Sequence, residues 1–210
     1  MEPERIVYIL DDDHAVLCSL ERLLRSADFE PIPFDHPDAF LSAATTFKPG
    51  CVLLDVRLPG MSGLDVQAQL LKMRHDLPVI VVTGQGDVQT AVRAMKAGAS
   101  DFLEKPYSDH ALLGAIESAF GKEGHSDLDI ADAARQVAAL SPREREVLDG
   151  LLAGRPNKLI AFDLGISVRT VEVHRARMME RLGMRQLAEV IRVGVIARLQ
   201  PPLSAAERKR

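Results

Sequence analysis

The N-terminal half of the chain alternates short apolar runs with amphipathic segments. Five runs of strand length are apolar at successive positions, which is typical of strands buried on both faces of a sheet. They are Arg5–Leu10, Glu30–Phe34, Cys51–Asp55, Pro78–Thr83 and Asp101–Leu103. Segments with apolar side chains three and four residues apart predict helices after each run. These are Ala15–Ala27, Asp38–Thr46, Leu64–Arg74, Val88–Ala97 and Ser108–Phe120.

This alternation of strands and helices predicts an α/β domain with a doubly wound parallel sheet of five strands and helices on both of its faces. The run Glu30–Phe34 contains Pro31 and Pro33, which cannot donate hydrogen bonds to a neighbouring strand. We therefore expect this run to form an edge strand.

From Ser141 onward the pattern contains helices alone. Ser141 and Glu144 form a capping box, and Pro142 occupies the first position of the helix that they begin. We expect this helix to continue to Ala153. Three more helices are predicted at Asn157–Asp163, Ser167–Leu182 and Gln186–Leu199.

The change of pattern predicts two domains. The stretch between them is polar and then acidic and rich in alanine, which favours a linker that becomes partly helical. The expected division is an α/β domain over 1–122, the linker over 123–140, an all-α four-helix domain over 141–203 and a tail over 204–210.

Composition restricts the class of protein. Of the 210 residues, 47% are hydrophobic and 27% charged, which is ordinary for a globular protein and excludes wholesale disorder. No apolar run approaches the roughly 18 residues of a membrane span, and the first residues lack a secretory signal. We therefore expect a cytoplasmic protein without a membrane partner. Cys18 and Cys51 are too few for a disulfide framework, and we expect two buried, reduced thiols.

The formal net charge of -4 conceals two halves of opposite sign. Residues 1–123 contain 11 Lys and Arg against 19 Asp and Glu, whereas residues 141–210 contain 14 against 8. Such a division suggests that an acidic domain is joined to a basic domain that binds nucleic acid or another polyanion. Basic faces also occur on proteins that bind no polyanion, so charge alone does not decide between these interpretations.

Polar side chains follow the predicted strands at the points where the strands end. They are Asp11, Asp12, Asp13, Asp55, Thr83 and Lys105. In an open parallel sheet these carboxyl ends meet at one edge, where ligands bind at the switch point of the winding. The sequence therefore predicts that these side chains lie in one acidic pocket.

The residue types in this pocket indicate metal-assisted phosphoryl transfer to an aspartate. Clustered carboxylates repel one another unless a cation offsets them, and Mg²⁺ suits one or two carboxylates plus a phosphoryl group. A carboxylate can itself act as the nucleophile and form an aspartyl-phosphate. Thr83 can donate its hydroxyl to one phosphoryl oxygen, and Lys105 can place its charge beside another. We expect Asp13 to cap the following helix rather than to bind metal.

Residues 3–122 resemble the receiver domains of two-component response regulators, which have the flavodoxin-like doubly wound fold. The motifs that carry this resemblance are Ile9–Asp13, Leu54–Gly63, Val82–Gly84 and Glu104–Pro106. The resemblance implies that Asp55 accepts phosphate from the phosphohistidine of a sensor histidine kinase. It also implies a regulator that takes part in its own phosphoryl transfer and dephosphorylation rather than an enzyme with a separate substrate.

The resemblance assigns a role to each pocket residue. Mg²⁺ would be the cofactor, and its implied ligands are Asp11, Asp12, Asp55 and the backbone carbonyl of Arg57. Thr83 and Lys105 would bind the phosphoryl group, and Lys105–Pro106 would be a cis peptide. Phe102 matches the aromatic switch position, which turns inward when Thr83 moves toward the phosphate.

The C-terminal pattern of two helices joined by a tight turn at Gly165 fits a helix-turn-helix. Such a motif places the N-terminal part of its second helix in the DNA major groove. An inward stripe of that helix is predicted at Val168, Val171, Met178 and Leu182. Side chains within reach of a groove are predicted at Arg169, Glu172, Val173, Arg175 and Ala176.

These residues resemble the four-helix DNA-binding domain of LuxR-type regulators. The motifs that carry the resemblance are Leu140–Leu148, Asn157–Ala161, Leu164–His174 and Leu182–Met184. In that family His174 is usually a structural residue or a contact to the DNA backbone. The DNA contacts that we expect are Arg169, Thr170, Glu172, Val173, His174, Arg175 and Arg177.

The two modules in this order are similar to the FixJ/NarL family of response regulators, and within it to the FixJ type. The similarity implies a transcription regulator that dimerises and binds DNA after phosphorylation of Asp55, and that activates nitrogen-fixation or microaerobic genes. The implied partners are a sensor histidine kinase, which in the FixJ type senses oxygen through haem, and double-stranded promoter DNA. The similarity also implies RNA polymerase and a second copy of the chain as partners.

Two alternatives come from other functional classes. Asp11 and Asp13 have the spacing of haloacid-dehalogenase-type phosphatases, in which Asp11 would be the nucleophile and Asp13 the acid and base. The helical C-terminal half could instead belong to an adaptor that binds only a partner protein. The position of the phosphorylated aspartate separates the first alternative from a receiver, and specific DNA binding separates the second.

Overall fold

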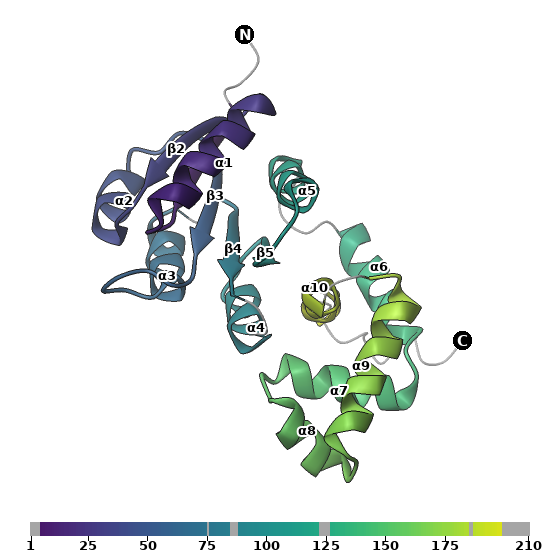
Figure 1. The fold of residues 1–210 in the computed structure, drawn as a ribbon. Coiled ribbons are helices and arrows are strands. Elements are labelled where there is room, and N and C mark those ends of the chain that lie inside the picture. The colour runs from purple at the N-terminus through teal and green to yellow at the C-terminus, as the bar shows by residue number, and fades with distance from the viewer. Residues whose placement is uncertain (1–4, 75, 85–87, 122–126, 185–186, 199–210) are drawn as a thin grey trace. The chain divides into compact units, whose positions relative to one another are not determined.

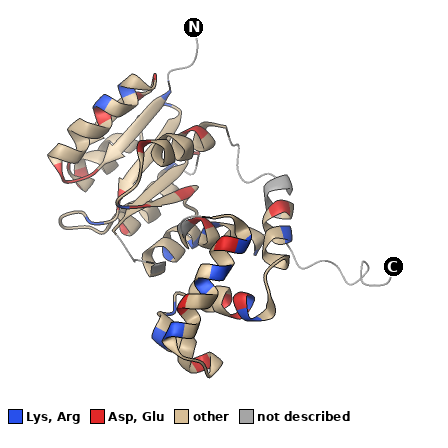
Figure 2. Ribbon diagram, turned by 45° about the vertical axis from the view of Figure 1, so that its right-hand side comes forward, with Lys and Arg blue, Asp and Glu red and all other residues tan. Residues whose placement is uncertain are grey.

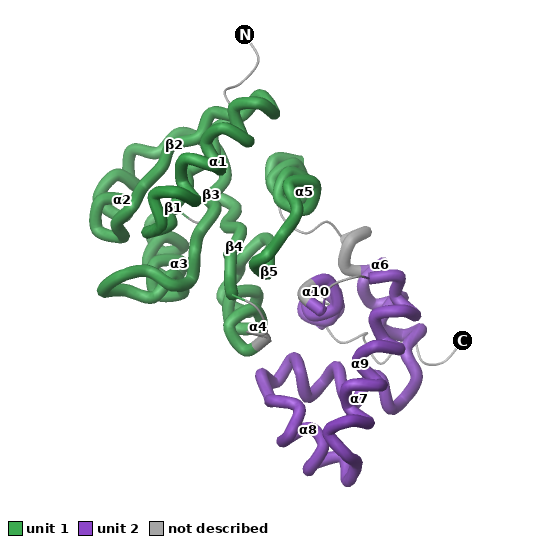
Figure 3. Tube along the Cα trace, in the orientation of Figure 1, with its two compact units in different colours: residues 1–122 green, residues 123–210 purple. Residues whose placement is uncertain are grey.

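The computed structural model describes residues 5–74, 76–84, 88–121, 127–184 and 187–198. The chain divides into two compact units, residues 1–122 and 123–210, which Figure 3 shows in different colours. Each unit is described by itself below. Within the described ranges, no helix combines the length and the apolar composition that crossing a membrane requires.

The first unit contains a five-stranded parallel sheet in the order β2-β1-β3-β4-β5 (Figure 1). Its strands are β1 (Ile6–Leu10), β2 (Glu30–Phe34), β3 (Gly50–Asp55), β4 (Val79–Thr83) and β5 (Asp101–Glu104). Its helices are α1 (His14–Ser26), α2 (Pro37–Ala44), α3 (Gly63–Met73), α4 (Val88–Lys96) and α5 (Asp109–Phe120). This doubly wound, flavodoxin-like arrangement confirms the predicted α/β fold.

The hydrophobic core buries the central strands of the sheet. Side chains of α1 and α5 pack against one face of the sheet in a cluster that includes Leu24, Leu53 and Ile116. β1, β3 and β4 are buried along their length, apart from the half-buried Gly50 at the start of β3. As predicted, β2 is an edge strand that pairs with β1. Because the central strands are fixed by the core, the polar residues at their ends are held in fixed places.

A side-chain cap holds the start of the helix next to the polar edge of the sheet. Asp13 accepts hydrogen bonds from the backbone N–H groups of Ala15 at 2.8 Å and Val16 at 3.4 Å. A cap of this kind typically stabilises a helix by about 1 kcal/mol. The predicted capping role of Asp13 is therefore confirmed.

The described part of the second unit consists of helices. They are α6 (Asp127–Ala138), α7 (Pro142–Leu152), α8 (Asn157–Leu164), α9 (Val168–Leu182) and α10 (Leu187–Ala197). The last four form the predicted helical DNA-binding fold. α6 lies in the stretch predicted to become partly helical, and it packs along α10. The capping box of α7 is confirmed, because Ser141 and Glu144 exchange hydrogen bonds of 2.8 and 3.3 Å.

Glycines in the left-handed conformation end both helices of the helix-turn-helix. Gly165 has a φ of 64° after α8, and Gly183 has a φ of 66° after α9. Residues with a Cβ atom rarely adopt this conformation. The turn between α8 and α9 therefore depends on Gly165, as the sequence predicted.

Two predictions of burial are wrong. Val168 is 40% exposed and does not belong to the inward stripe of α9, which begins at the fully buried Val171. Val168 is the first residue of α9, one turn before the buried positions of that helix begin. Cys51 is buried as expected, but Cys18 is only half-buried because α1 turns that position away from the sheet.

Candidate functional site

The carboxyl ends of the strands bring four predicted site residues to one edge of the sheet. Asp11 follows β1, Asp55 ends β3, Thr83 ends β4 and Lys105 follows β5. Asp11, Asp55 and Thr83 are 4%, 6% and 3% exposed, so the pocket lies largely out of contact with water. Because water screens charges weakly there, electrostatic contacts in this pocket are stronger than on the surface.

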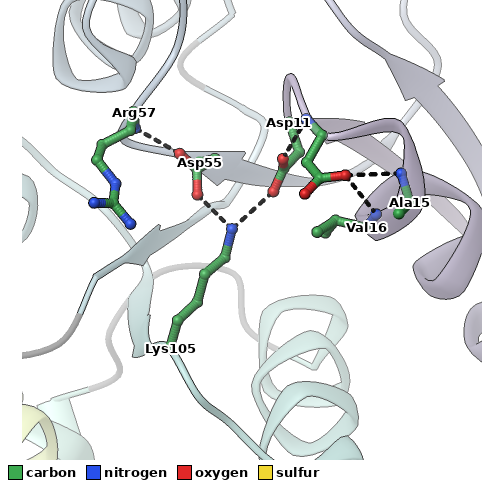
Figure 4. Close-up of polar contacts among 7 residues, drawn as sticks. Asp11, Ala15, Val16, Asp55, Arg57 and Lys105 are labelled. Atoms are coloured by element: carbon green, nitrogen blue, oxygen red, sulfur yellow. Dashed lines mark hydrogen bonds and ion pairs between the residues drawn. The ribbon is translucent and has the colours of Figure 1, made fainter.

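Lys105 joins the two buried carboxylates. Its Nζ atom donates a hydrogen bond of 2.9 Å to Asp11 Oδ2 and one of 2.6 Å to Asp55 Oδ1 (Figure 4). Burial opposes the charged form of Lys105, but these contacts with Asp55 and Asp11 outweigh it and raise the pKa of the ammonium. Lys105 therefore remains a cation beside Asp55 at neutral pH.

The second oxygen of Asp55 contacts the main chain. Asp55 Oδ2 accepts a hydrogen bond of 2.5 Å from the backbone N–H of Arg57. Burial raises the pKa of Asp55, although the hydrogen bonds from Lys105 and Arg57 act in the opposite direction. The carboxylate is thus held in one orientation by two donors, in a setting that favours neutralisation of its charge.

Gly63 is a functional position that reasoning from the residues missed. It begins α3, and a Cβ atom at this position would lie 2.1 Å from the backbone oxygen of Asp55. The Gly63 N–H donates to the carbonyl of Val56 at 2.9 Å. The close approach of α3 to the backbone of Asp55 therefore requires glycine at this position, and a glycine directly after a helix cap was the available signal.

The pocket residues fit a bound Mg²⁺ ion. Asp11 and Asp55 already direct one oxygen each toward a single cationic group, the Lys105 ammonium. Asp12 is exposed, and it lines an open depression of about 630 Å³ together with residues 56–62, which include Arg57. In the described ranges no three His, Cys, Asp or Glu side chains converge as a ready ligand set. One or two carboxylates plus water is the coordination that Mg²⁺ commonly accepts.

Two features implied by the receiver resemblance are visible around Thr83. The Lys105–Pro106 peptide is cis, as implied. Phe102 is 5% exposed on β5, where it pairs in register with Val81 of the neighbouring β4. Thr83 itself pairs with Glu104, so Phe102 lies on the neighbouring strand two positions before the level of Thr83.

The predicted DNA contacts lie on different sides of α9. Arg169, Glu172, Val173 and Arg177 are exposed, whereas Thr170, His174 and Arg175 are half-buried. Arg169 and Glu172 form an ion pair of 3.3 Å, and the Arg169 side chain is 84% exposed. Both basic and acidic positions occur on the helices of this unit (Figure 2). The structure therefore brings part of the predicted set onto one solvent-facing surface.

Arg175 lies apart from that surface. Its Nη1 atom donates a hydrogen bond of 3.0 Å to the Oδ1 atom of Asn157, the first residue of α8. The sequence prediction placed Arg175 with the groove-facing residues. The structure instead places its guanidinium against the first helix of the helix-turn-helix.

Comparison with known protein families identifies both units. Residues 7–117 match the response regulator receiver domain, and residues 138–194 match the bacterial regulatory proteins of the luxR family. The transcriptional regulatory protein FixJ of Bradyrhizobium diazoefficiens is 44% identical over 194 residues, which cover 91% of this chain and 95% of FixJ. The response regulator protein TmoT of Ectopseudomonas mendocina is 40% identical, with coverages of 91% and 89%.

Solved structures give the same result. The crystal structure of full-length FixJ from B. japonicum is 43% identical, with a TM-score of 0.55 and coverage of 94% of this chain and 98% of that one. The response regulator StyR is 40% identical, with a TM-score of 0.53 and coverages of 91% and 98%. The chain therefore belongs to the two-component response regulators of the FixJ/NarL family, phosphorylation-activated transcription regulators with a receiver domain and a LuxR-type DNA-binding domain.

Proposed function

We propose that Asp55 is the phosphoacceptor, and that it receives its phosphoryl group from the phosphohistidine of a sensor histidine kinase. The observation that supports this most directly is the Lys105 ammonium, which contacts both Asp55 and Asp11 in a pocket at the strand ends. A second donor, the Arg57 N–H, holds the other oxygen of Asp55. This arrangement orients a buried nucleophile next to a fixed positive charge.

In the transfer step, an oxygen of Asp55 forms a bond to phosphorus while the bond from phosphorus to the histidine nitrogen breaks. The Lys105 ammonium stabilises the negative charge of the transferred group, and the Thr83 hydroxyl donates to one of its oxygens. Asp11, Asp12, Asp55 and the Arg57 carbonyl would hold Mg²⁺, which supplies further charge neutralisation when bound. In dephosphorylation, water would attack the same phosphorus and the bond to the Asp55 oxygen would break, which releases inorganic phosphate and free Asp55. The Lys105 ammonium would assist this step through the same contacts with the phosphoryl oxygens.

Phosphorylation of the pocket would shift the equilibrium between two packing arrangements around Thr83 and Phe102. A phosphoryl group adds about -1.5 to -2 charge and strong acceptors at one point. Thr83 moves toward these acceptors, and the Phe102 ring turns into the space beside it. This switch promotes formation of a dimer, which presents two copies of α9 to double-stranded promoter DNA.

The output of this switch is transcription. Because the FixJ proteins match this chain over nearly its whole length, we propose nitrogen-fixation or microaerobic genes as targets, with an oxygen-sensing haem kinase and RNA polymerase as partners. TodT and TmoT match almost as well, so the family alone leaves the regulated genes open. Sequencing of genomic DNA bound by the phosphorylated protein would identify the target genes.

The phosphoacceptor assignment is tested with acetyl phosphate and Mg²⁺. The wild-type chain should gain one phosphoryl group, mapped to Asp55 by mass spectrometry, and should bind selected DNA more tightly. Asp55→Asn should gain none and should show no increase in DNA affinity. Asp65→Asn, which changes an exposed carboxylate on α3, should behave like the wild type.

The alternatives predict other outcomes. A phosphatase of the haloacid-dehalogenase type would carry the phosphoryl group on Asp11, but Asp13, its required acid and base, is engaged as the cap of α1. An adaptor would fail to bind specific DNA with or without phosphate. Phosphate on Asp11, or retained phosphorylation of Asp55→Asn, would refute the proposed function.

A further inference from the structure

Arg175 differs from Arg169 of the same helix because it forms a hydrogen bond with Asn157 of α8. Arg175 is half-buried and donates to Asn157 Oδ1 at 3.0 Å, across 18 positions of the chain. By contrast, the side chain of Arg169 is 84% exposed and contacts Glu172 of its own helix. The two arginines therefore differ in both exposure and the helix that orients them.

Helix geometry places Arg175 on the flank of α9 rather than on its outward face. Each residue advances about 100° around a helix, so Arg175 lies about 40° from Val171 and about 160° from Val173. Val171 is completely buried, whereas Val173 is 36% exposed. Arg175 cannot point in the same direction as Val173, and its side chain instead reaches the N-terminal end of α8.

Asn157 belongs to the first helix of the helix-turn-helix, the helix that lies against the DNA backbone in complexes of this kind. The second helix enters the major groove, while the first helix crosses the phosphate backbone. Contacts to phosphate fix the position of the protein and carry no direct sequence information. The side-chain oxygen of Asn157 accepts this hydrogen bond and so orients the guanidinium of Arg175 at the start of α8.

We propose that Arg175 contacts a DNA phosphate rather than a base, and that Asn157 is the positioning residue that aims its guanidinium. This inference rests on the proposed DNA-binding function and assigns roles within it. Base discrimination is left to the outward residues Arg169, Glu172 and Val173. Arg175 and Asn157 together set the affinity for DNA of any sequence.

The test uses the full chain phosphorylated with acetyl phosphate, a duplex recovered by selection, and a scrambled duplex of equal length. Fluorescence anisotropy gives the dissociation constants over a range of KCl concentrations. Arg175→Ala should weaken binding to both duplexes by a similar factor of about 10, and should reduce the slope of log K against log[salt] by about 1 per bound monomer. Arg175→Lys keeps the charge and should preserve the slope while losing part of the affinity.

Asn157→Ala should weaken binding to both duplexes by a factor of about 3 and leave the salt slope unchanged, because the charge of Arg175 remains. On the Arg175→Ala background the same substitution should have no further effect, since Asn157 acts through Arg175. Arg169→Ala is the matched control and should lower binding to the selected duplex more than to the scrambled one. Thermal unfolding of each variant shows whether the fold is intact.

Selective loss on the selected duplex in Arg175→Ala would show that Arg175 contacts a base, and would overturn the proposal. Additive losses in the double variant would show that Asn157 acts independently of Arg175, which also contradicts it. If the phosphorylated wild type binds neither duplex, the proposed DNA-binding function itself fails, and this inference fails with it.

Discussion

In the pocket of the first unit two buried carboxylates contact a half-buried lysine. On the outward face of α9, by contrast, Arg169 and Glu172 are exposed and contact each other along one helix. Asp11, Asp55 and Lys105 come from the ends of three strands and depend on the whole sheet for their positions. Arg169 and Glu172 depend on one helix alone. Charges in the pocket should therefore affect both stability and chemistry, while those on α9 should affect recognition with little effect on stability.

The largest effect is expected from Lys105→Met. The substitution removes the positive charge between two buried carboxylates, so phosphorylation by acetyl phosphate should slow by about 100-fold or more. The free energy of unfolding of the receiver should fall by about 2 kcal/mol, because both carboxylates stay buried without their partner. Phosphate-affinity electrophoresis and urea unfolding measure the two quantities. The exposed Lys72 of α3 provides the control, and Lys72→Met should change neither.

Gly63→Ala tests whether backbone packing supports the pocket. The added Cβ atom would meet the backbone oxygen of Asp55, and we expect a loss of about 3 kcal/mol in unfolding free energy. A Cβ atom at Gly114 of α5 would meet no atom of the described residues within 4 Å, and Gly114→Ala should stabilise the chain by about 0.5–1 kcal/mol. Equal effects of the two substitutions would show that α3 can move away from Asp55 without cost.

Glu144 shows that the second unit also contains a buried charge, away from the outward face of α9. It is 2% exposed and accepts hydrogen bonds from the Ser141 N–H at 2.8 Å and Arg181 Nε at 2.9 Å. Burial opposes its ionisation, but these hydrogen bonds prevail and lower its pKa. Glu144→Gln should therefore reduce the unfolding free energy of this unit by about 1–2 kcal/mol at pH 7.

The sign of the pH dependence follows from the lowered pKa of Glu144. Its contribution is fully present above the unfolded value, which lies near 4.5, and is lost as pH falls through the folded value. Calorimetry of the full chain should thus show the wild type and Glu144→Gln converging below pH 4.5. A difference that stays constant through acid pH would mean that the charge of Glu144 contributes nothing.

The smallest effect on stability is expected from Arg169→Ala. Because this side chain is 84% exposed, its ion pair with Glu172 should contribute no more than about 0.5 kcal/mol to folding. DNA selected by this variant should nevertheless differ in sequence from DNA selected by the wild type. A loss of stability comparable to that of Lys105→Met would remove the contrast between the two regions.

The fold and the pocket residues were predictable because each depends on local pattern and strand order. Apolar runs located the strands, and parallel pairing then required Asp11, Asp55, Thr83 and Lys105 to share an edge. The sequence could not show that Lys105 contacts both carboxylates, since that depends on side-chain conformations. It could not show that α3 approaches Asp55 closely enough to require Gly63.

The second unit was harder to predict in detail. Helix period and the Gly165 turn located α8 and α9, but the inward stripe began one turn later than expected, at Val171 rather than Val168. Grouping Arg175 with the groove-facing residues overlooked its angular distance from Val173, which the helix period alone would have revealed. The packing of α6 along α10 was not predicted, because the polar and then acidic, alanine-rich composition of residues 123–140 indicated a linker.

The two oxygens of Asp55 are chemically inequivalent in this fold. Oδ1 faces the Lys105 ammonium, and Oδ2 faces the main-chain N–H of Arg57. Under the proposed function, phosphorylation would turn one of them into the bridging oxygen of an acyl phosphate, which is a weaker acceptor. One of the two donors would then be free to contact the new phosphoryl group. The carboxylate is thus oriented in part by the main chain, so every residue except proline at position 57 would keep this donor.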